Sequence, residues 1–230
     1  MGVQSRHSGY QNYFQLSPVN NRSDTIVSPD DFVLSIYPKR VTAGHLKLLL
    51  SRHDEEAKKQ IIAFIYHRLH HRYIVPLFKV PKKFRSGFLM MASACLMIET
   101  MQAFYTGKKE TKGKSRNSFK AFFERNGELF PGLAAHEEAF FYDIRCGILH
   151  QAESRRGYRI LRSGPLFDAR AKTINAEAFL KALKRALAGY IVRLRGSKEP
   201  AFWENAVNKV GFICDNCRSD VKRERPISVD

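Results

Sequence analysis

A run of apolar residues from Phe88 to Ile98 constrains the fold more than any other part of the sequence. The run lies in a segment, Gly87 to about Tyr105, that is apolar on all sides when it is drawn as a helix. Because such a helix must be covered by other elements, the segment predicts a central helix, with Ser86 as its N-cap. The run is shorter than the roughly 20 apolar residues that span a bilayer, so we expect no membrane partner.

Periodic apolar residues predict further helices on both sides of this segment. Three- and four-residue steps from 42 to about 73 indicate helix, with the polar stretch 52–56 as a break. Pro76 and Pro81 are expected to end this unit, because proline disrupts a helix interior. The remaining predicted helices cover residues 118–125, 134–154, 175–196 and 201–210. The expected fold class is therefore mainly α.

Two short stretches predict β-structure. Phe32, Leu34 and Ile36 alternate with their neighbours, which suits a short strand before Pro38. Residues 157–173 are expected to form a small β-hairpin around a Gly-Pro turn.

These elements divide the chain into three predicted parts. Residues 1–40 form an N-terminal arm, partly irregular, residues 41–196 a helical domain, and residues 197–230 a C-terminal helix with a Cys-x-x-Cys basic tail. Residues 1–28 lack the continuous apolar region of a secretory signal, and four cysteines in a chain of this length do not form a disulfide scaffold. A cytoplasmic location with reduced thiols is the simpler expectation.

The chain is strongly basic, with a formal net charge of +17 and a pI near 9.9. Clustered cations gain affinity for nucleic acid by releasing counterions from the phosphate backbone, so RNA is the predicted partner. A basic surface with only non-specific affinity is the alternative. The cations expected to hold an RNA strand are Arg155, Arg156, Arg159, Lys108, Lys109, Lys112 and Lys114.

The predicted helix 134–154 carries the residues best suited to chemistry. At 100° per residue, an apolar stripe made of Phe140, Phe141, Ile144 and Ile148 faces the core. Arg145 and His150 lie on opposite flanks of this stripe, with a mixed face between them that consists of Tyr142, Cys146 and Leu149. A second subunit is one candidate to cover that face.

An arginine and a histidine together provide the minimum chemistry for metal-free RNA cleavage. The Arg145 guanidinium fits phosphate oxygens, and the His150 imidazole can take and give a proton. The spacing alone is weak support, because Arg40 and His45 repeat it in the same chain. A structural salt bridge of Arg145 and a helix-end histidine remain the alternative.

Four segments together resemble one group of bacterial proteins, mostly uncharacterised. They are residues 72–76, 95–100, 141–153 and 164–168, and the helix with the Arg-x4-His pattern resembles the HEPN superfamily over about residues 45 to 195. The resemblance implies a four- or five-helix bundle, a homodimer with facing Arg/His helices, and metal-independent endoribonuclease activity in toxin–antitoxin or antiviral defence systems. Such a protein would act with an antitoxin or a defence-system partner.

By this match Arg145 and His150 take the catalytic positions, and Tyr142 and Gln151 of the same motif are expected to support them. Two positions depart from the family. Cys146 replaces a polar residue that many members carry after the arginine, and Ala152 replaces a tyrosine of nucleotidyltransferase-paired toxins. Silencing by modification of that tyrosine is therefore not supported. A non-catalytic module that binds nucleic acid or a nucleotide is the alternative function.

Glu99 lies on the otherwise apolar helix, where a carboxylate without a partner is costly. Arg145 is the expected partner, which makes Glu99 a supporting residue of the site. An ion pair elsewhere is the alternative.

No metal cofactor is expected. Cys214 and Cys217 have the spacing of half a zinc site, but structural zinc usually has four ligands, so they are weak candidates. His67, His70 and His71 alternate with arginines, which favours a solvated basic face over a metal site.

Overall fold

The computed structural model describes residues 28–111 and 113–217. Most of the predicted arm, Lys112 and the end of the basic tail lie outside the described residues. The described chain is mainly helical, as predicted. Its helices are η1 (Pro29–Asp31), α1 (Ala43–Ser51), α2 (Glu55–Leu69), η2 (His70–Ile74), α3 (Val75–Phe78), η3 (Lys82–Phe84), α4 (Gly87–Thr106), α5 (Ser115–Arg125), α6 (Glu137–Ala139), η4 (Phe140–Arg145), α7 (Cys146–Gln151), α8 (Ala176–Gly196) and α9 (Pro200–Asp215).

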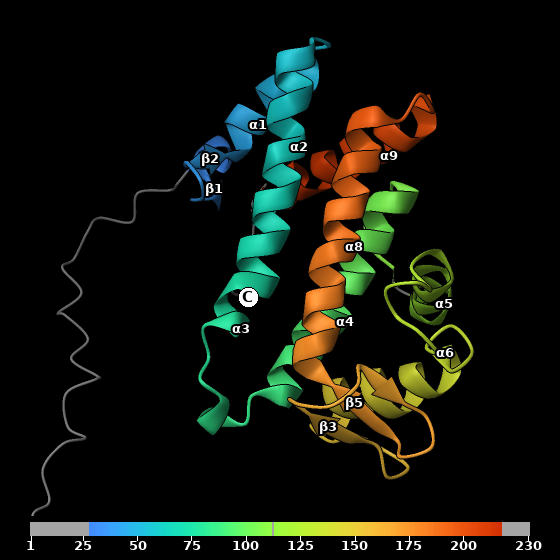
Figure 1. Ribbon diagram of the computed structural model, residues 1–230. Helices are drawn as coiled ribbons and strands as arrows, with labels where there is room; N and C mark the ends of the chain where they lie inside the picture. The colour runs from blue at the N-terminus through green and yellow to red at the C-terminus, as the bar shows by residue number, and fades with distance from the viewer. Residues whose placement is uncertain (1–27, 112, 218–230) are drawn as a thin grey trace, which may run out of the picture.

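The apolar helix α4 lies at the centre, as its composition predicts (Figure 1). It packs against α8, α5, α9 and the helix that starts at Glu137. With 20 residues and a mean hydropathy of 1.4, α4 is long and apolar enough to cross a membrane by length and composition, although the shorter run Phe88–Ile98 suggested otherwise. In this fold 61% of the apolar window is buried by the rest of the protein.

Polar side chains set the break between α1 and α2. Thr42 accepts the His45 N–H at 3.2 Å to begin α1, and Asp54 accepts the Ala57 N–H at 2.9 Å to begin α2. The second helix does not end at Pro76. A π-turn, η2, brings the Val75 N–H to the His70 carbonyl, and Pro76 then occupies the first turn of α3, where its missing N–H leaves no bond unmade.

The predicted hairpin over 157–173 is wrong. Strand β3 (Arg159–Leu161) pairs in parallel with β5 (Thr173–Asn175), and β4 (Phe167–Asp168) pairs with the other edge of β5 in antiparallel fashion. Burial explains the order, because β5 is buried along its whole length and takes the middle of the sheet. A separate pair, β1 (Val33–Ser35) with β2 (Val41–Thr42), contains the predicted strand before Pro38.

One arginine ties this sheet to the start of α4. Arg162 donates to the Ser86 hydroxyl at 3.3 Å and to the Val80 carbonyl at 3.3 Å. Ser86 stands at the expected N-cap position, but its side chain makes no capping bond. Asn175, in contrast, caps α8 as predicted by accepting the Glu177 and Ala178 N–H groups, both at 3.1 Å.

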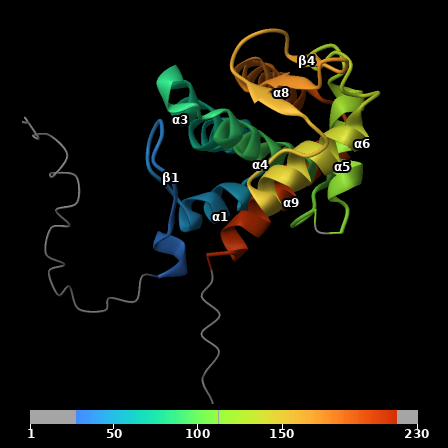
Figure 2. The ribbon, with the colours of Figure 1, turned by 90° about the horizontal axis from the view of Figure 1, so that it is seen from below.

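A cluster of aromatic rings fixes the helix of interest against the core. Phe140 stacks on Phe179 of α8 with ring centroids 5.4 Å apart and planes 10° apart. Phe119, Phe123 and Phe130 surround this pair and are all fully buried. The view from below shows α9 beside α1 (Figure 2). Residues assigned by sequence to a separate C-terminal part thus belong to the same core, through Phe202, Ala206 and Val210 on α9.

Candidate RNA-cleavage site

The candidate site lies on one helix that contains a π-turn. Three segments, α6, η4 and α7, follow each other without a break from Glu137 to Gln151. The helix is shorter than predicted, because the chain before Glu137 forms turns and Ala152 adopts a left-handed conformation with φ of 56°. The predicted stripe is buried. The wide turn alters the 100° spacing, and π-turns inside α-helices often occur at functional sites.

Arg145 is held by Glu99, the partner that the sequence predicted. Its Nη2 and Nε lie 2.7 and 2.9 Å from the same oxygen, Oε1 of Glu99. The two side chains are only 16% and 17% exposed. The guanidinium also lies over the Phe141 ring, 5.4 Å from its centroid. Two of its three nitrogens are therefore fixed, and the planar group has a defined orientation.

The third nitrogen of Arg145 points to His150. Nη1 lies 3.3 Å from Nε2 of His150 and 3.8 Å from Sγ of Cys146. Since a guanidinium can only donate, this contact requires Nε2 to accept, which places the proton of a neutral imidazole on Nδ1. The His150 ring is exposed, so this end of the site is open to solvent. The structure brings the two predicted catalytic residues together.

The second oxygen of Glu99 binds a different part of the chain. Oε2 accepts hydrogen bonds from the hydroxyls of Thr111 at 3.1 Å and Ser115 at 3.5 Å. Neither hydroxyl was identified from the sequence. Both belong to the charged loop after α4 and the start of α5, so the carboxylate joins that loop to Arg145. The predicted cations Lys108, Lys109 and Lys114 are exposed on the same loop.

Of the other predicted residues, some lie on the helix of the site and others lie elsewhere. Gln151 accepts a hydrogen bond from Nε of Arg155 at 3.0 Å, which ties that cation to the residue after His150. Tyr142 is 39% exposed, and the guanidinium of Arg116 lies 5.7 Å from its ring centroid. Arg159 instead donates to the Ala171 carbonyl at 3.4 Å across the sheet. Lys112 lies outside the described residues.

Asp143 is a buried charge that sequence reasoning missed. Its side chain is 3% exposed, and Oδ1 lies 3.5 Å from Nε of Arg156, a largely exposed partner. Its backbone carbonyl accepts the Arg155 N–H at 2.8 Å, which folds the segment after the helix back along it. A Cβ on Gly147 would come within 2.4 Å of the Glu153 carbonyl oxygen, so only glycine permits this approach.

The three histidines of η2 and α2 do not form the solvated face expected from sequence. The His71 ring lies against Tyr37 with centroids 3.7 Å apart and planes tilted by 32°, and His70 stacks on Tyr66 with centroids 5.1 Å apart. Burial lowers the pKa of His67 and of His70, and the Nδ1 atoms of both are buried without a hydrogen-bond partner. Contacts with the two tyrosines leave the three histidines half-buried rather than fully solvated.

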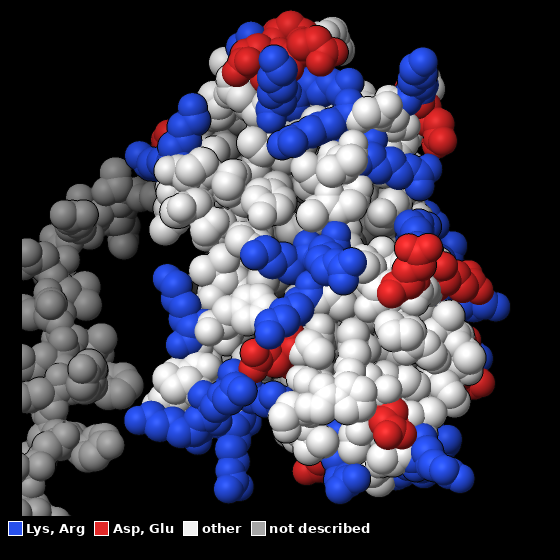
Figure 3. All heavy atoms as spheres, in the orientation of Figure 1, with Lys and Arg blue, Asp and Glu red and all other residues white. Residues whose placement is uncertain are grey.

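Cys214 lies in the last turn of α9 rather than in a tail, and burial raises its pKa to about 11. Cys217 follows it and donates to the Ile213 carbonyl at 3.6 Å. Within residues 28–111 and 113–217, no three His, Cys, Asp or Glu side chains gather as a metal would require. On the face drawn in Figure 3, Lys and Arg outnumber Asp and Glu and gather in several groups.

Comparisons with known proteins give no identification. The chain matches no family model, no curated protein and no solved structure.

Proposed function

We propose that this protein is a metal-independent endoribonuclease of HEPN type. The observation that carries the proposal is the orientation of Arg145 by Glu99 so that its remaining nitrogen lies 3.3 Å from the exposed His150. A fixed cation beside a titratable imidazole is what phosphodiester cleavage without a metal needs.

The Arg145–His150 contact marks where the scissile phosphate would bind. A phosphate oxygen that inserts between Nη1 and Nε2 replaces the 3.3 Å contact and accepts the hydrogen bond from Nη1. Glu99 stays on the other edge of the guanidinium and keeps it in place.

The reaction follows from the groups available. His150 takes the proton of the ribose 2′-hydroxyl, O2′ attacks phosphorus, and the P–O5′ bond breaks. The O5′ leaving group takes a proton from an imidazolium, and Arg145 stabilises the charge on the phosphoryl oxygens. The products are a 2′,3′-cyclic phosphate and a 5′-hydroxyl. In a homodimer the two copies of His150 would divide the roles of base and acid. The half-exposed face of Tyr142, Cys146 and Leu149 is the surface on which we propose that the copies meet.

Arg155 and the lysines of the 107–114 loop would hold the strand. A cytoplasmic role as a toxin or antiviral effector, with an antitoxin or defence partner, is the setting that the family resemblance suggests. It rests on that resemblance alone.

The test is to incubate the purified protein with single-stranded RNA in EDTA and to analyse the ends of the products. We expect 2′,3′-cyclic phosphate ends, loss of cleavage in His150→Ala and Arg145→Ala, and full cleavage in His45→Ala. His45 is a suitable control because it belongs to the second Arg-x4-His match and is exposed on α1. Cleavage that survives His150→Ala would refute the mechanism.

The ion pair itself favours a second candidate. Arg145 is neutralised by Glu99 and mostly buried, as in a purely structural salt bridge. A non-catalytic module that binds nucleic acid would show salt-sensitive RNA binding, no turnover, and unchanged affinity in His150→Ala. The same RNA samples, measured for binding and for cleavage, separate the two functions.

A further inference from the structure

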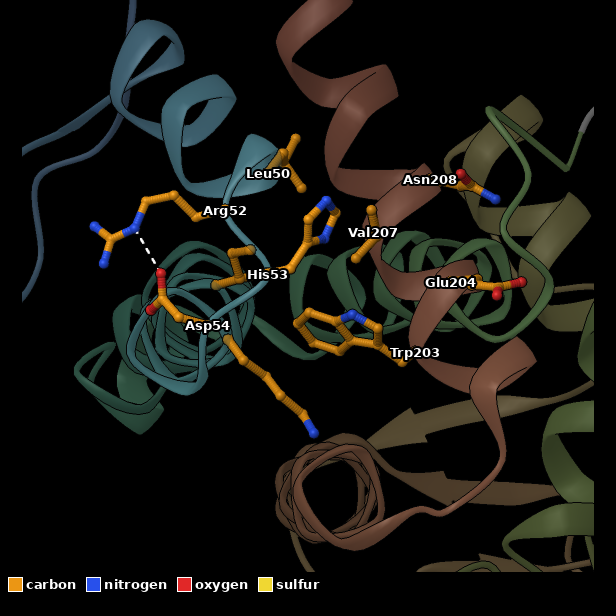
Figure 4. A pocket seen from close by; sticks show the side chains of 10 residues that line it. Leu50, Arg52, His53, Asp54, Trp203, Glu204, Val207 and Asn208 are labelled. Atoms are coloured by element: carbon orange, nitrogen blue, oxygen red, sulfur yellow. Dashed lines mark hydrogen bonds and ion pairs between the residues drawn. The ribbon is translucent and has the colours of Figure 1, made fainter.

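A cavity separate from the Arg145–His150 site lies at the α1–α2 connection, against the first half of α9 (Figure 4). Its volume is about 350 Å³. This is at the lower end of the range of about 300 to 1,000 Å³ for small-molecule pockets, so it suits one small ligand. Figure 1 places α1 and α9 at the end of the molecule opposite β3 and β5. The floor is aliphatic and consists of Leu50, Ile61 and Val207.

Two planar rings line this cavity. Figure 4 shows the imidazole of His53, from the α1–α2 connection, directed toward Leu50 and Val207, with the indole of Trp203, from α9, lying below it on the same cavity. Within residues 28–111 and 113–217, the His53 ring has no hydrogen bond, ion pair or ring contact. A half-buried indole beside an imidazole without partners suits a flat heteroaromatic group, because every such ring has a π-face that can stack on an aromatic side chain.

A cation stands beside the indole. Nζ of Lys58 lies 5.6 Å from the centroid of the Trp203 ring, and its ion pair with Glu55 is long, at 3.8 Å. The nearby carboxylate of Asp54 is already occupied by Nε of Arg52 at 2.8 Å and by the Ala57 N–H. A second carboxylate, Glu204, also lines the cavity, but Figure 4 shows it directed away from His53 and Trp203. Lys58 is therefore the cation available to an anionic group of a ligand, and the net charge of +17 favours the approach of an anion.

Asn208 also lines the cavity, but Figure 4 shows its side-chain amide directed away from His53 and Trp203. The contacts that remain are two rings, an aliphatic lining and one cation, which together suit a flat ring with an attached anion.

We propose that this cavity binds a nucleotide, with its base between His53 and Trp203 and its phosphate at Lys58. The nucleotide is either free or one residue of a single-stranded RNA. The inference involves neither Arg145 nor His150 and so does not depend on the proposed cleavage.

The single tryptophan of the chain is Trp203, so its fluorescence reports on this cavity alone. The experiment titrates the full chain with AMP, GMP, CMP and UMP, with a single-stranded oligouridylate, and with ribose 5-phosphate. We expect saturable quenching by at least one mononucleotide or by the oligomer, and none by ribose 5-phosphate. Saturation by a mononucleotide identifies a free ligand, and saturation by the oligomer alone identifies RNA.

Variants locate the binding. We expect His53→Ala to weaken it about tenfold, the size of a lost stacking contact. Lys58→Ala should weaken it as well, whereas Lys59→Ala, which removes the same charge from the next residue outside the cavity, should not. His150→Ala should bind normally. The proposal is overturned if no probe gives saturable quenching, if ribose 5-phosphate quenches equally, or if Lys58→Ala and Lys59→Ala behave alike.

Discussion

Replacement of Glu99 and Arg145 measures how much their ion pair contributes to the free energy of unfolding. The pair combines short distances, 2.7 and 2.9 Å, with side chains that are 16% and 17% exposed. Exposed ion pairs couple by about 0 to 1 kcal/mol, and breaking a fully buried one costs about 3 to 5 kcal/mol. For this partly buried pair we expect a coupling energy of about 2 kcal/mol, or about 30-fold in the unfolding equilibrium constant.

The assay is a double-mutant cycle, with urea unfolding of the wild type, Glu99→Gln, Arg145→Gln and the double variant. The matched control is the cycle for Arg116 and Glu138, whose ion pair has a similar length of 3.0 Å but exposures of 48% and 62%. That cycle should give less than about 1 kcal/mol and should weaken further in 1 M salt. Equal coupling energies in the two cycles would refute the argument that burial strengthens the Glu99 pair.

Three further predictions follow from burial and close contacts. Gly147→Ala should lower the melting temperature markedly, because its Cβ would lie 2.4 Å from the Glu153 oxygen. Gly189 lies on the exposed face of α8, where an added Cβ meets no atom within 4 Å, so Gly189→Ala should stabilise the protein by about 0.5 to 1 kcal/mol. Thermal melts in which both substitutions shift the melting temperature in the same direction would contradict this reasoning. Because burial lowers the pKa of His67 and His70 from 6.5, stability should be full above pH 6.5 and should fall as the pH drops through the folded-state pKa values. The free energy of unfolding in urea, measured at several pH values, should fall less in acid for His67→Gln than for the wild type. The same dependence on pH in both proteins would count against this prediction. With its pKa raised to about 11, Cys214 should be mostly protonated at pH 8 and should react with iodoacetamide more slowly than half-buried Cys217, as peptide mass spectrometry can follow.

The sequence predicted the helices well because their apolar faces are long and periodic. The interval from Ala176 to Gly196 has a cap, a stop and ten buried side chains, and it lies where the prediction placed it. The break before α2 was also found, since Asp54 is a strong N-cap and the residues around it are polar.

The errors have two physical causes, the pairing of strands that are not consecutive in the chain and an irregular turn inside a helix. The β3 strand pairs with β5 rather than with β4, because β5 is buried and has two edges to offer. Pro76 did not stop the helix, since a π-turn placed it where no N–H is needed. Neither a parallel pairing nor a π-turn leaves a periodic pattern in a single sequence.

Some contacts of the candidate site were predictable from the sequence and others were not. The Glu99–Arg145 contact was predictable, because a carboxylate on an apolar helix needs a cation and Arg145 lies on the flank of a core helix. Thr111 and Ser115 were not predictable, because hydroxyls occur on most surfaces and nothing in their spacing points to Glu99. Asp143 was missed because the regular 100° spacing placed it away from the core, and it is the segment after the helix, folded back through Arg155 and Arg156, that contacts it.

Glu99 connects three elements through two oxygens, and this has a consequence for how the site would respond to RNA. Oε1 orients Arg145, and Oε2 holds the start of α5 and the basic loop through Thr111 and Ser115. If the proposed RNA strand binds the loop cations, it would pull on the same carboxylate that fixes the guanidinium. If the loop moves, Glu99 must either follow it and free Arg145 for phosphate, or keep Arg145 and release the hydroxyls. Thr111→Val removes the hydroxyl from Oε2 without altering charge, so a change in cleavage with unchanged RNA affinity would show that the loop acts on Arg145 through Glu99.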